Sequence, residues 1–152
     1  MIGRYVSRHF STLANQKVGF IGLGNMGLPM IRNLLKHNYS VTAFDVDEEK
    51  MKEAESAGAT IAPDVKETTI DQDVVLTMLP NTEIVEETRL GSNGIYEHAK
   101  ENALIIDSST ISPLASTRMA DSGNDFNLRV IDAPVSGGVP GAVNGTLTFM
   151  VG

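Results

Sequence analysis

The sequence predicts an α/β domain with a doubly wound, mostly parallel sheet. Short apolar segments typical of buried strands alternate with segments of helical periodicity, and this alternation favours parallel strands joined by crossover helices. The first apolar segment, residues 17–21, leads directly into a pattern of three glycines, G-x-G-x-x-G, after which helical periodicity begins. A strand, a glycine-rich turn and a helix in this order are typical of the dinucleotide-binding unit of a Rossmann-type fold.

The strands are expected from short apolar runs bounded by turn residues. They cover residues 17–21, 40–45, 60–62, 73–79, 103–107 and 129–132. The helices are expected from apolar residues at helical spacing and from capping residues. They cover residues 25–37, 47–57 and 95–100, and two more begin at Asn81 or Thr82 and at Ser112. Asn38 is expected to follow the first helix in a left-handed conformation, and the polar stretch 121–125 is expected to be an ordinary loop.

Length and composition exclude several classes of protein. With 152 residues the chain suits one good-sized domain and hardly two. A net charge of −7 offers no basic surface for nucleic acid, and the chain has no apolar run long enough for a membrane span. It also has no cysteine, which excludes a disulfide, a thiolate nucleophile and a cysteine-based zinc site. The three histidines are dispersed and suggest no metal cluster.

The first 16 residues differ in composition from the rest of the chain. Arg4 and Arg8 alternate with apolar and hydroxyl side chains, and no acidic residue precedes Asp45. Such leaders are typical of mitochondrial transit peptides, so we expect residues 1–16 to direct the protein to the mitochondrial matrix, with cleavage after Phe10. A disordered or cloned N-terminus is the alternative. The dinucleotide-binding domain is then expected over residues 17–152.

The glycine turn predicts how a dinucleotide would bind. Gly22 permits the tight turn, Gly24 lets the backbone approach the pyrophosphate, and Gly27 lets the helix pack close to the strand. The first N–H groups of the helix then face the anion, although an ordinary structural turn is the alternative. The predicted cofactor-binding residues of the turn are Gly22, Leu23, Gly24, Asn25, Met26 and Gly27.

Asp45 predicts which dinucleotide binds. It ends the second predicted strand, 18 positions after Gly27, where a carboxylate can accept hydrogen bonds from the adenosine ribose hydroxyls. The same carboxylate would repel a 2′-phosphate, and no basic residue follows until Lys50. We therefore expect NAD rather than NADP as the cofactor.

Further candidate residues follow other predicted strands, because ligands of an open parallel sheet bind beyond the carboxyl ends of its strands. Leu79 and Pro80 are expected to form an apolar wall beside the nicotinamide ribose, with the hydroxyl of Thr110 near the same place. Helix capping is the alternative role for Thr110 and for the two serines before it, Ser108 and Ser109.

Two long motifs resemble the β-hydroxyacid dehydrogenase family. Residues 22–30, with Asn33 and Leu34, are similar to the family's cofactor signature. Residues 132–138, followed by 141–142 and 145–152, are similar to its substrate signature. The resemblance runs from residue 17 to the last residue and agrees with cofactor contacts by Leu79, Pro80 and Thr110.

The second motif implies a substrate site at Ser136, Gly137 and Gly138. A serine hydroxyl and bare backbone N–H groups suit a small carboxylate, which agrees with this implication. The alternative is an ordinary glycine-rich loop at a strand end, with a structural role only.

The resemblance implies NAD-dependent oxidation of a small 3-hydroxy acid. It is strongest to mitochondrial members that convert 3-hydroxyisobutyrate to methylmalonate semialdehyde in valine breakdown. The family's all-helical C-terminal domain is absent from this chain, and its catalytic lysine is expected beyond Gly152. No catalytic residue is therefore assigned here, and the isolated chain is expected to be inactive.

The resemblance also implies that the full-length protein is a homo-oligomer. Alternatives for its function are a tartronate-semialdehyde or glyoxylate reductase, which share both motifs, and a catalytically silent NAD-binding fragment. A 6-phosphogluconate dehydrogenase is less favoured, because that enzyme often prefers NADP and Asp45 disfavours a 2′-phosphate.

Overall fold

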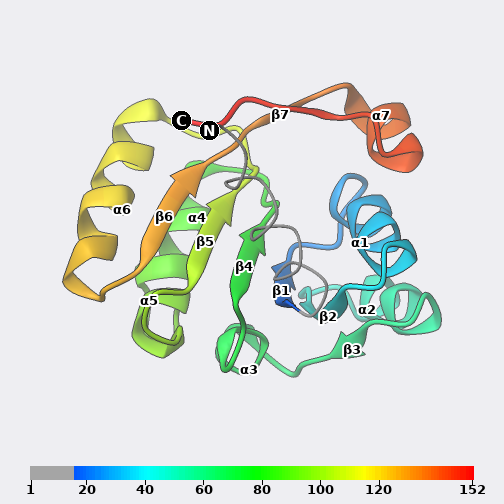
Figure 1. The fold of residues 1–152 in the computed structure, drawn as a ribbon, viewed down its shortest axis with the longest axis horizontal. Helices are drawn as coiled ribbons and strands as arrows, with labels where there is room; N and C mark the ends of the chain where they lie inside the picture. The colour runs from blue at the N-terminus through cyan, green and yellow to red at the C-terminus, as the bar shows by residue number, and fades with distance from the viewer. Residues whose placement is uncertain (1–15) are drawn as a thin grey trace, which may run out of the picture.

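Parallel strands form the central sheet of the computed structural model, which describes residues 16–152 (Figure 1). In spatial order this six-stranded sheet is β3-β2-β1-β4-β5-β6, and every neighbouring pair is parallel. Its strands are β1 (Lys17–Ile21), β2 (Ser40–Phe44), β3 (Thr60–Ile61), β4 (Val74–Thr77), β5 (Leu104–Asp107) and β6 (Arg129–Asp132). The strand order reverses between β1 and β4, which is where such sheets bind ligands. The predicted fold class is confirmed.

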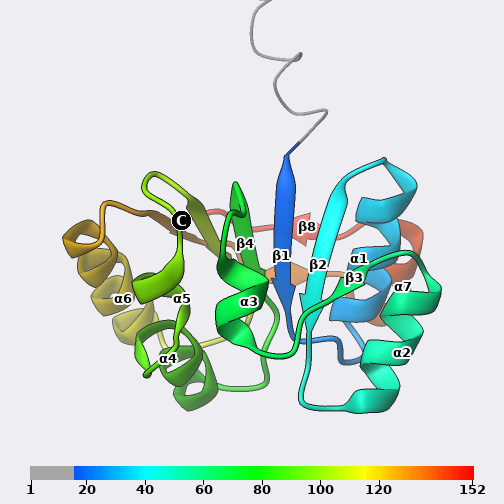
Figure 2. The ribbon, with the colours of Figure 1, turned by 90° about the horizontal axis from the view of Figure 1, so that it is seen from below.

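Helices cover both faces of this sheet (Figure 2). They are α1 (Gly27–Lys36), α2 (Glu48–Ser56), α3 (Val65–Thr69), α4 (Thr82–Leu90), α5 (Ile95–His98), α6 (Pro113–Asp125) and α7 (Gly138–Asn144). Helices α1 and α2 pack on one face and α3 to α6 on the other, while α7 packs on α1. Right-handed crossovers produce this division, because the chain moves across the sheet in one direction from β1 to β3 and in the opposite direction from β3 to β6.

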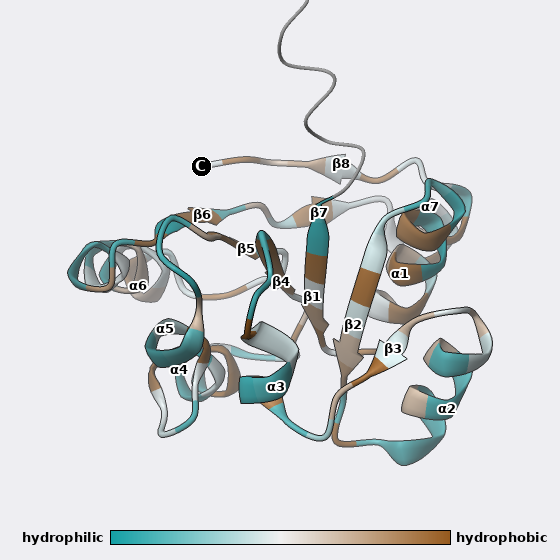
Figure 3. Cartoon of the chain, turned by 60° about the horizontal axis from the view of Figure 1, so that its bottom comes forward, coloured by the Kyte–Doolittle hydropathy of each residue, from teal (hydrophilic) through white to brown (hydrophobic). Residues whose placement is uncertain are grey.

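Alternating strand residues supply the two cores. Val18 and Phe20 of β1 pack with Ile31 of α1 on one face. Val75 and Ile105 belong to the core on the other face, which includes the side chains of α5. The inner strands are accordingly hydrophobic in Figure 3, whereas the outer surface of α2 is hydrophilic. Within residues 16–152, no helix combines the length and the apolar character that crossing a bilayer would require.

Several predicted caps are confirmed. The carboxylate of Asp47 accepts a hydrogen bond from the N–H of Glu49 at 2.9 Å and so caps α2. Asn81, rather than Thr82, caps α4, because its side-chain oxygen accepts from the N–H of Ile84 at 2.9 Å. Asn38 follows α1 with a φ of 63°, which satisfies the expected left-handed end.

The prediction of a loop at residues 121–125 is wrong, because α6 continues to Asp125. The polar side chains of this stretch lie mainly on the solvent side, while Gly123 is buried. A Cβ at Gly123 would lie 2.3 Å from Cγ2 of Val130, so this glycine lets the helix pack directly against β6. The stretch therefore combines the composition of a loop with the packing of a helix.

Four elements have no counterpart among the predictions. Helix α3 lies between β3 and β4, and β7 (Val135–Ser136) and β8 (Thr148–Phe149) form an antiparallel pair on either side of α7. The predicted transit peptide, residues 1–16, lies outside the described residues except for Gln16. Its role stays a prediction.

Candidate functional site

The glycine turn after β1 is shaped by two close approaches of the backbone. Gly22 has a φ of +99°, and a Cβ there would lie 2.2 Å from the carbonyl oxygen of Met78. A Cβ at Gly27 would lie 1.8 Å from the carbonyl oxygen of Gly22. Both positions therefore require glycine for the fold itself.

Gly24 differs from the other two glycines of the turn. It is exposed, and a Cβ placed on it would meet no atom within 4 Å. No described residue accepts a hydrogen bond from the N–H of Gly24 or Asn25, which directly precede the first turn of α1. Open space above unpaired N–H groups at a helix N-terminus fits the pyrophosphate of a dinucleotide.

The structure divides the remaining residues of the turn by where their side chains lie. Leu23 is fully buried, so only its backbone groups can face a ligand, and Met26 is partly buried against the same core. Asn25 is exposed. Ligand contacts by these residues remain predictions.

Asp45 lies beside the glycine turn, as its position at the end of β2 predicts. Its Oδ2 accepts a hydrogen bond from the N–H of Leu23 at 2.5 Å, and its Oδ1 accepts from the N–H of Asp47 at 2.9 Å. A carboxylate accepts several hydrogen bonds, so these two contacts leave acceptor capacity for ribose hydroxyls. Asp45 thus ties the turn to the start of α2, a role that the sequence pattern does not reveal.

The end of β4 also contacts the glycine turn. The N–H of Met78 donates to the carbonyl of Ile21 at 3.0 Å, and the side chain of Leu79 lies 3.1 Å from where a Cβ of Gly22 would be. Leu79 is half-buried, whereas Pro80 and Thr110 are exposed. The structure therefore brings Leu79 to the turn, and Pro80 and Thr110 follow the ends of β4 and β5 at the same edge of the sheet.

Side chains connect the ends of β4 and β5. The buried carboxylate of Asp107 accepts hydrogen bonds from the hydroxyl of Thr77 at 2.9 Å and from the N–H of Ser109 at 3.0 Å. The hydroxyl of Ser109 in turn accepts from the N–H of Leu79 at 2.8 Å. Helix capping, the alternative role for Ser109, is wrong, because the N-cap of α6 is Ser112.

The predicted substrate residues lie at the start of α7. Ser136 ends β7, and Gly137 and Gly138 have φ values of 127° and 58°. All three are exposed, and no side chain caps α7. In Figure 1, β7 lies beyond the carboxyl ends of β4, β5 and β6, the edge where a ligand is expected, and α7 lies next to α1.

The titratable groups with shifted pKa values lie elsewhere. A hydrogen bond from Lys100, helped by the N–H of Lys17, lowers the pKa of Asp73 at the amino end of β4. The Glu53 carboxylate raises the pKa of Lys50 on α2. Within residues 16–152, no three acidic or histidine side chains gather where they could hold a metal ion.

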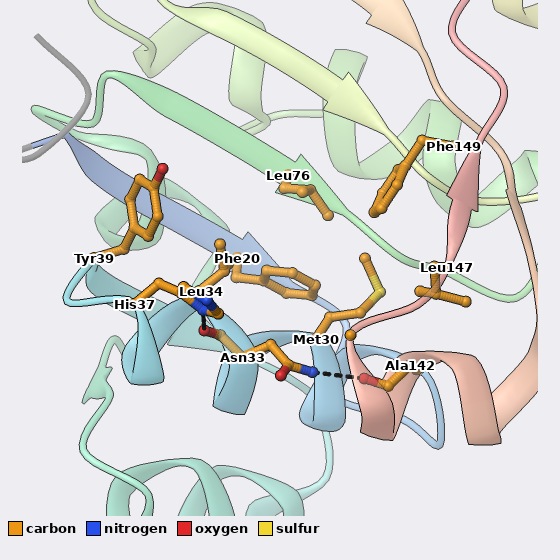
Figure 4. Close-up of a pocket in the computed structure, with 11 residues that line it drawn as sticks. Phe20, Met30, Asn33, Leu34, His37, Tyr39, Leu76, Ala142, Leu147 and Phe149 are labelled. Atoms are coloured by element: carbon orange, nitrogen blue, oxygen red, sulfur yellow. Dashed lines mark hydrogen bonds between the residues drawn. The ribbon is translucent and has the colours of Figure 1, made fainter. Parts of the chain in front are cut away.

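A cavity of about 240 Å³ lies on the α1 face of the sheet (Figure 4). None of residues 22–27 lines it, so it is separate from the predicted cofactor site. Its lining is mostly apolar and includes Phe20, Met30, Leu76, Leu147 and Phe149.

Asn33 lies at the edge of this cavity, and the sequence predicts no role for its side chain beyond its place in the cofactor signature. Its side-chain nitrogen donates to the carbonyl of Ala142 at 2.7 Å and so connects α1 with α7 (Figure 4). No sequence signal joins two residues 109 positions apart, so this contact could not be found from one sequence.

The fold and the glycine turn define a nucleotide-binding domain of the dehydrogenase type. Residues 17–152 match the family described as the NAD binding domain of 6-phosphogluconate dehydrogenase. The chain belongs to this family, and its cofactor is NAD. The resemblance to the β-hydroxyacid dehydrogenases is also confirmed by the individual relatives.

The mitochondrial 3-hydroxyisobutyrate dehydrogenase of Mus musculus is 44% identical over 93% of this chain and 42% of the relative. The NAD-dependent L-serine dehydrogenase of Pseudomonas aeruginosa is 39% identical over 90% of this chain and 46% of the relative. Among solved structures, Mycobacterium tuberculosis 3-hydroxyisobutyrate dehydrogenase with L-serine has a TM-score of 0.85 and 37% identity, over 90% of this chain and 46% of that one. The chain thus spans less than half the length of these relatives.

Proposed function

We propose that this chain is the cofactor-binding half of an NAD-dependent 3-hydroxyacid dehydrogenase. The observation that carries the proposal is the glycine turn, where Gly24 leaves open space above unpaired N–H groups and Asp45 lies alongside. In this arrangement the turn holds the pyrophosphate and Asp45 accepts from the ribose hydroxyls. When bound, NAD supplies the acceptor for the hydride of the alcohol.

The proposed substrate is 3-hydroxyisobutyrate, which would be oxidised to methylmalonate semialdehyde. Its carboxylate would bind the hydroxyl of Ser136 and the backbone N–H groups of Gly137 and Gly138, since strongly positive φ values open the backbone to a small anion. The similarity to the mouse enzyme supports this choice.

L-serine is a second candidate substrate, because one relative is an L-serine dehydrogenase and one similar structure contains L-serine. It is itself a 3-hydroxy acid. Both substrates therefore present a carboxylate to residues 136–138. They differ in another group, which a second domain would contact.

No lysine is assigned as a base within this chain, so the proposal predicts binding without turnover. Calorimetric titration of residues 17–152 should show that NAD binds more tightly than NADP. No heat of binding with NAD at millimolar concentration would overturn the proposal. Production of NADH from 3-hydroxyisobutyrate or L-serine by the same sample would instead overturn the inactivity of the isolated chain.

We also propose the mitochondrial matrix as the location, on the basis of the leader composition and of relatives described as mitochondrial. A fluorescent reporter fused after residue 16 tests this. Import with cleavage after Phe10 supports the proposal, and a cytosolic, uncleaved reporter contradicts it.

A further inference from the structure

Two loops follow β4 and β5, and they carry the residues predicted to lie beside the nicotinamide ribose. Backbone pairing of the two strands continues only as far as the N–H of Ser108, which donates to the carbonyl of Thr77 at 2.9 Å. Beyond that bond, the two loops are joined by side chains: Ser109 accepts from the N–H of Leu79, and Thr82 accepts from the N–H of Ser112 at 3.1 Å.

Ser109 is itself held in place. It is 2% exposed, and its own N–H donates to Oδ1 of Asp107, which is 1% exposed. The same oxygen accepts from the hydroxyl of Thr77, so Asp107 fixes both strand ends at once. A serine with a buried, anchored backbone presents its hydroxyl in one direction, toward the N–H of Leu79.

Burying Asp107 in this way lowers the stability of the fold. The second carboxylate oxygen of Asp107 is buried and has no hydrogen-bond partner among residues 16–152. An unpaired buried polar atom destabilises a folded protein. Stability alone therefore does not explain the buried carboxylate of Asp107. What it does contribute is a fixed position for Ser109 and, through Ser109, for the backbone of Leu79.

We propose that Ser109, anchored by Asp107, is a positioning residue for the nicotinamide end of bound NAD. It fixes the backbone of Leu79, whose side chain lies against Gly22 of the glycine turn. Without this bond, Leu79 and Pro80 lose their fixed distance from the turn. The adenosine end, held by the turn and Asp45, is independent of it. The inference rests on the proposed function.

Calorimetry with NAD and with ADP-ribose, which lacks the nicotinamide, tests this proposal. Wild-type chain should bind NAD more tightly than ADP-ribose. Ser109→Ala should lower the affinity for NAD about tenfold, the effect of losing one positioned hydrogen bond, and change that for ADP-ribose less than about twofold.

Ser108→Ala is the matched control. This neighbouring serine is equally buried, and its hydroxyl has no partner among residues 16–152, so its removal should leave both affinities unchanged. Ser109→Cys preserves the packing while weakening the acceptor, and it should reproduce the selective loss if the alanine variant does not fold.

The outcomes separate this inference from the proposed function. A wild-type chain that binds neither ligand overturns the proposed function and this inference with it. If the wild type binds both ligands, equal affinity for the two overturns the inference alone. Equal loss of both in the Ser109 variants, or loss of neither, does the same.

Discussion

Asn33 on α1 donates a hydrogen bond of 2.7 Å from its side-chain nitrogen to the carbonyl oxygen of Ala142 on α7. The same nitrogen lies 3.1 Å from the carbonyl oxygen of Pro29 and 3.4 Å from that of Val143. The last carbonyls of a helix have no partners within it, and here one amide reaches two of those of α7, the carbonyls of Ala142 and Val143. The contact joins the helix after the cofactor turn to the helix that begins at the predicted substrate residues.

Replacing Asn33 should loosen α7. We expect Asn33→Ala to lower the free energy of unfolding by about 1–2 kcal/mol, because the carbonyl of Ala142 loses its donor. Urea denaturation followed by circular dichroism measures this. Lys36→Ala, an exposed change near the end of the same helix, is the control and should have a much smaller effect. Equal midpoints for the two variants would contradict the role of the contact.

The glycines of the turn should separate folding from binding. Gly24→Ala has room for its methyl group, so the variant should fold with nearly wild-type stability and lose about tenfold or more of its NAD affinity. Gly27→Ala would force the methyl group into the carbonyl of Gly22 and should destabilise the chain by about 3 kcal/mol or prevent folding. Thermal unfolding and calorimetry measure the two effects. Unchanged NAD affinity in Gly24→Ala would argue against binding at this turn.

Asp45 should control the choice between NAD and NADP. We expect Asp45→Asn to weaken NAD binding about tenfold, because neutral acceptors bind ribose hydroxyls less strongly, and to leave NADP binding equal or stronger. The ratio of the two dissociation constants is the measurement. Glu48→Gln removes one negative charge from the exposed first turn of α2 and controls for net charge. An identical ratio in both variants would show that Asp45 does not contact the ribose.

Asp73 should make the stability of the chain depend on pH. Hydrogen bonds from Lys100 and from the N–H of Lys17 lower its pKa in the folded state, so the unfolded chain binds this proton more readily. The stabilisation is therefore present above about pH 4 and is lost as the pH falls through the lower, folded pKa.

The carboxylate of Asp73 is about one-third exposed, and solvent screening limits the effect to about 0.5 kcal/mol. Urea denaturation at pH 6 and below pH 4 should show a smaller loss for Asp73→Asn than for wild type. Asp121→Asn, on an exposed part of α6, should behave like wild type. If Asp73→Asn were as acid-sensitive as wild type, the ion pair would have no role in acid stability.

Much of the fold could be predicted because its signals are local. The glycine turn, the strand before it and Asp45 at the end of β2 are each encoded within a few neighbouring residues. Asp47 and Asn81 likewise cap helices through contacts within three residues. Local chemistry of this kind can be recognised in one sequence.

The remainder depends on contacts between distant segments. From the sequence, Gly123 resembles a loop residue, and only the structure shows that Val130 packs against it. Likewise, the hydroxyl of Ser109 resembles a helix cap, and only the structure shows that its partner is the N–H of Leu79. The position of α7 depends on Asn33, far away in the sequence. Periodicity and propensity carry no information about such partners, so these parts of the candidate site required the structure.

The unequal surroundings of the three glycines bear on how the motif is interpreted in other proteins. Gly22 and Gly27 meet backbone atoms, whereas Gly24 meets none. A related domain that kept this fold but no longer bound nucleotides would still need glycine at positions 22 and 27. The residue at position 24 could change. Gly22 and Gly27 therefore indicate the fold, whereas Gly24 indicates whether the domain still binds a nucleotide.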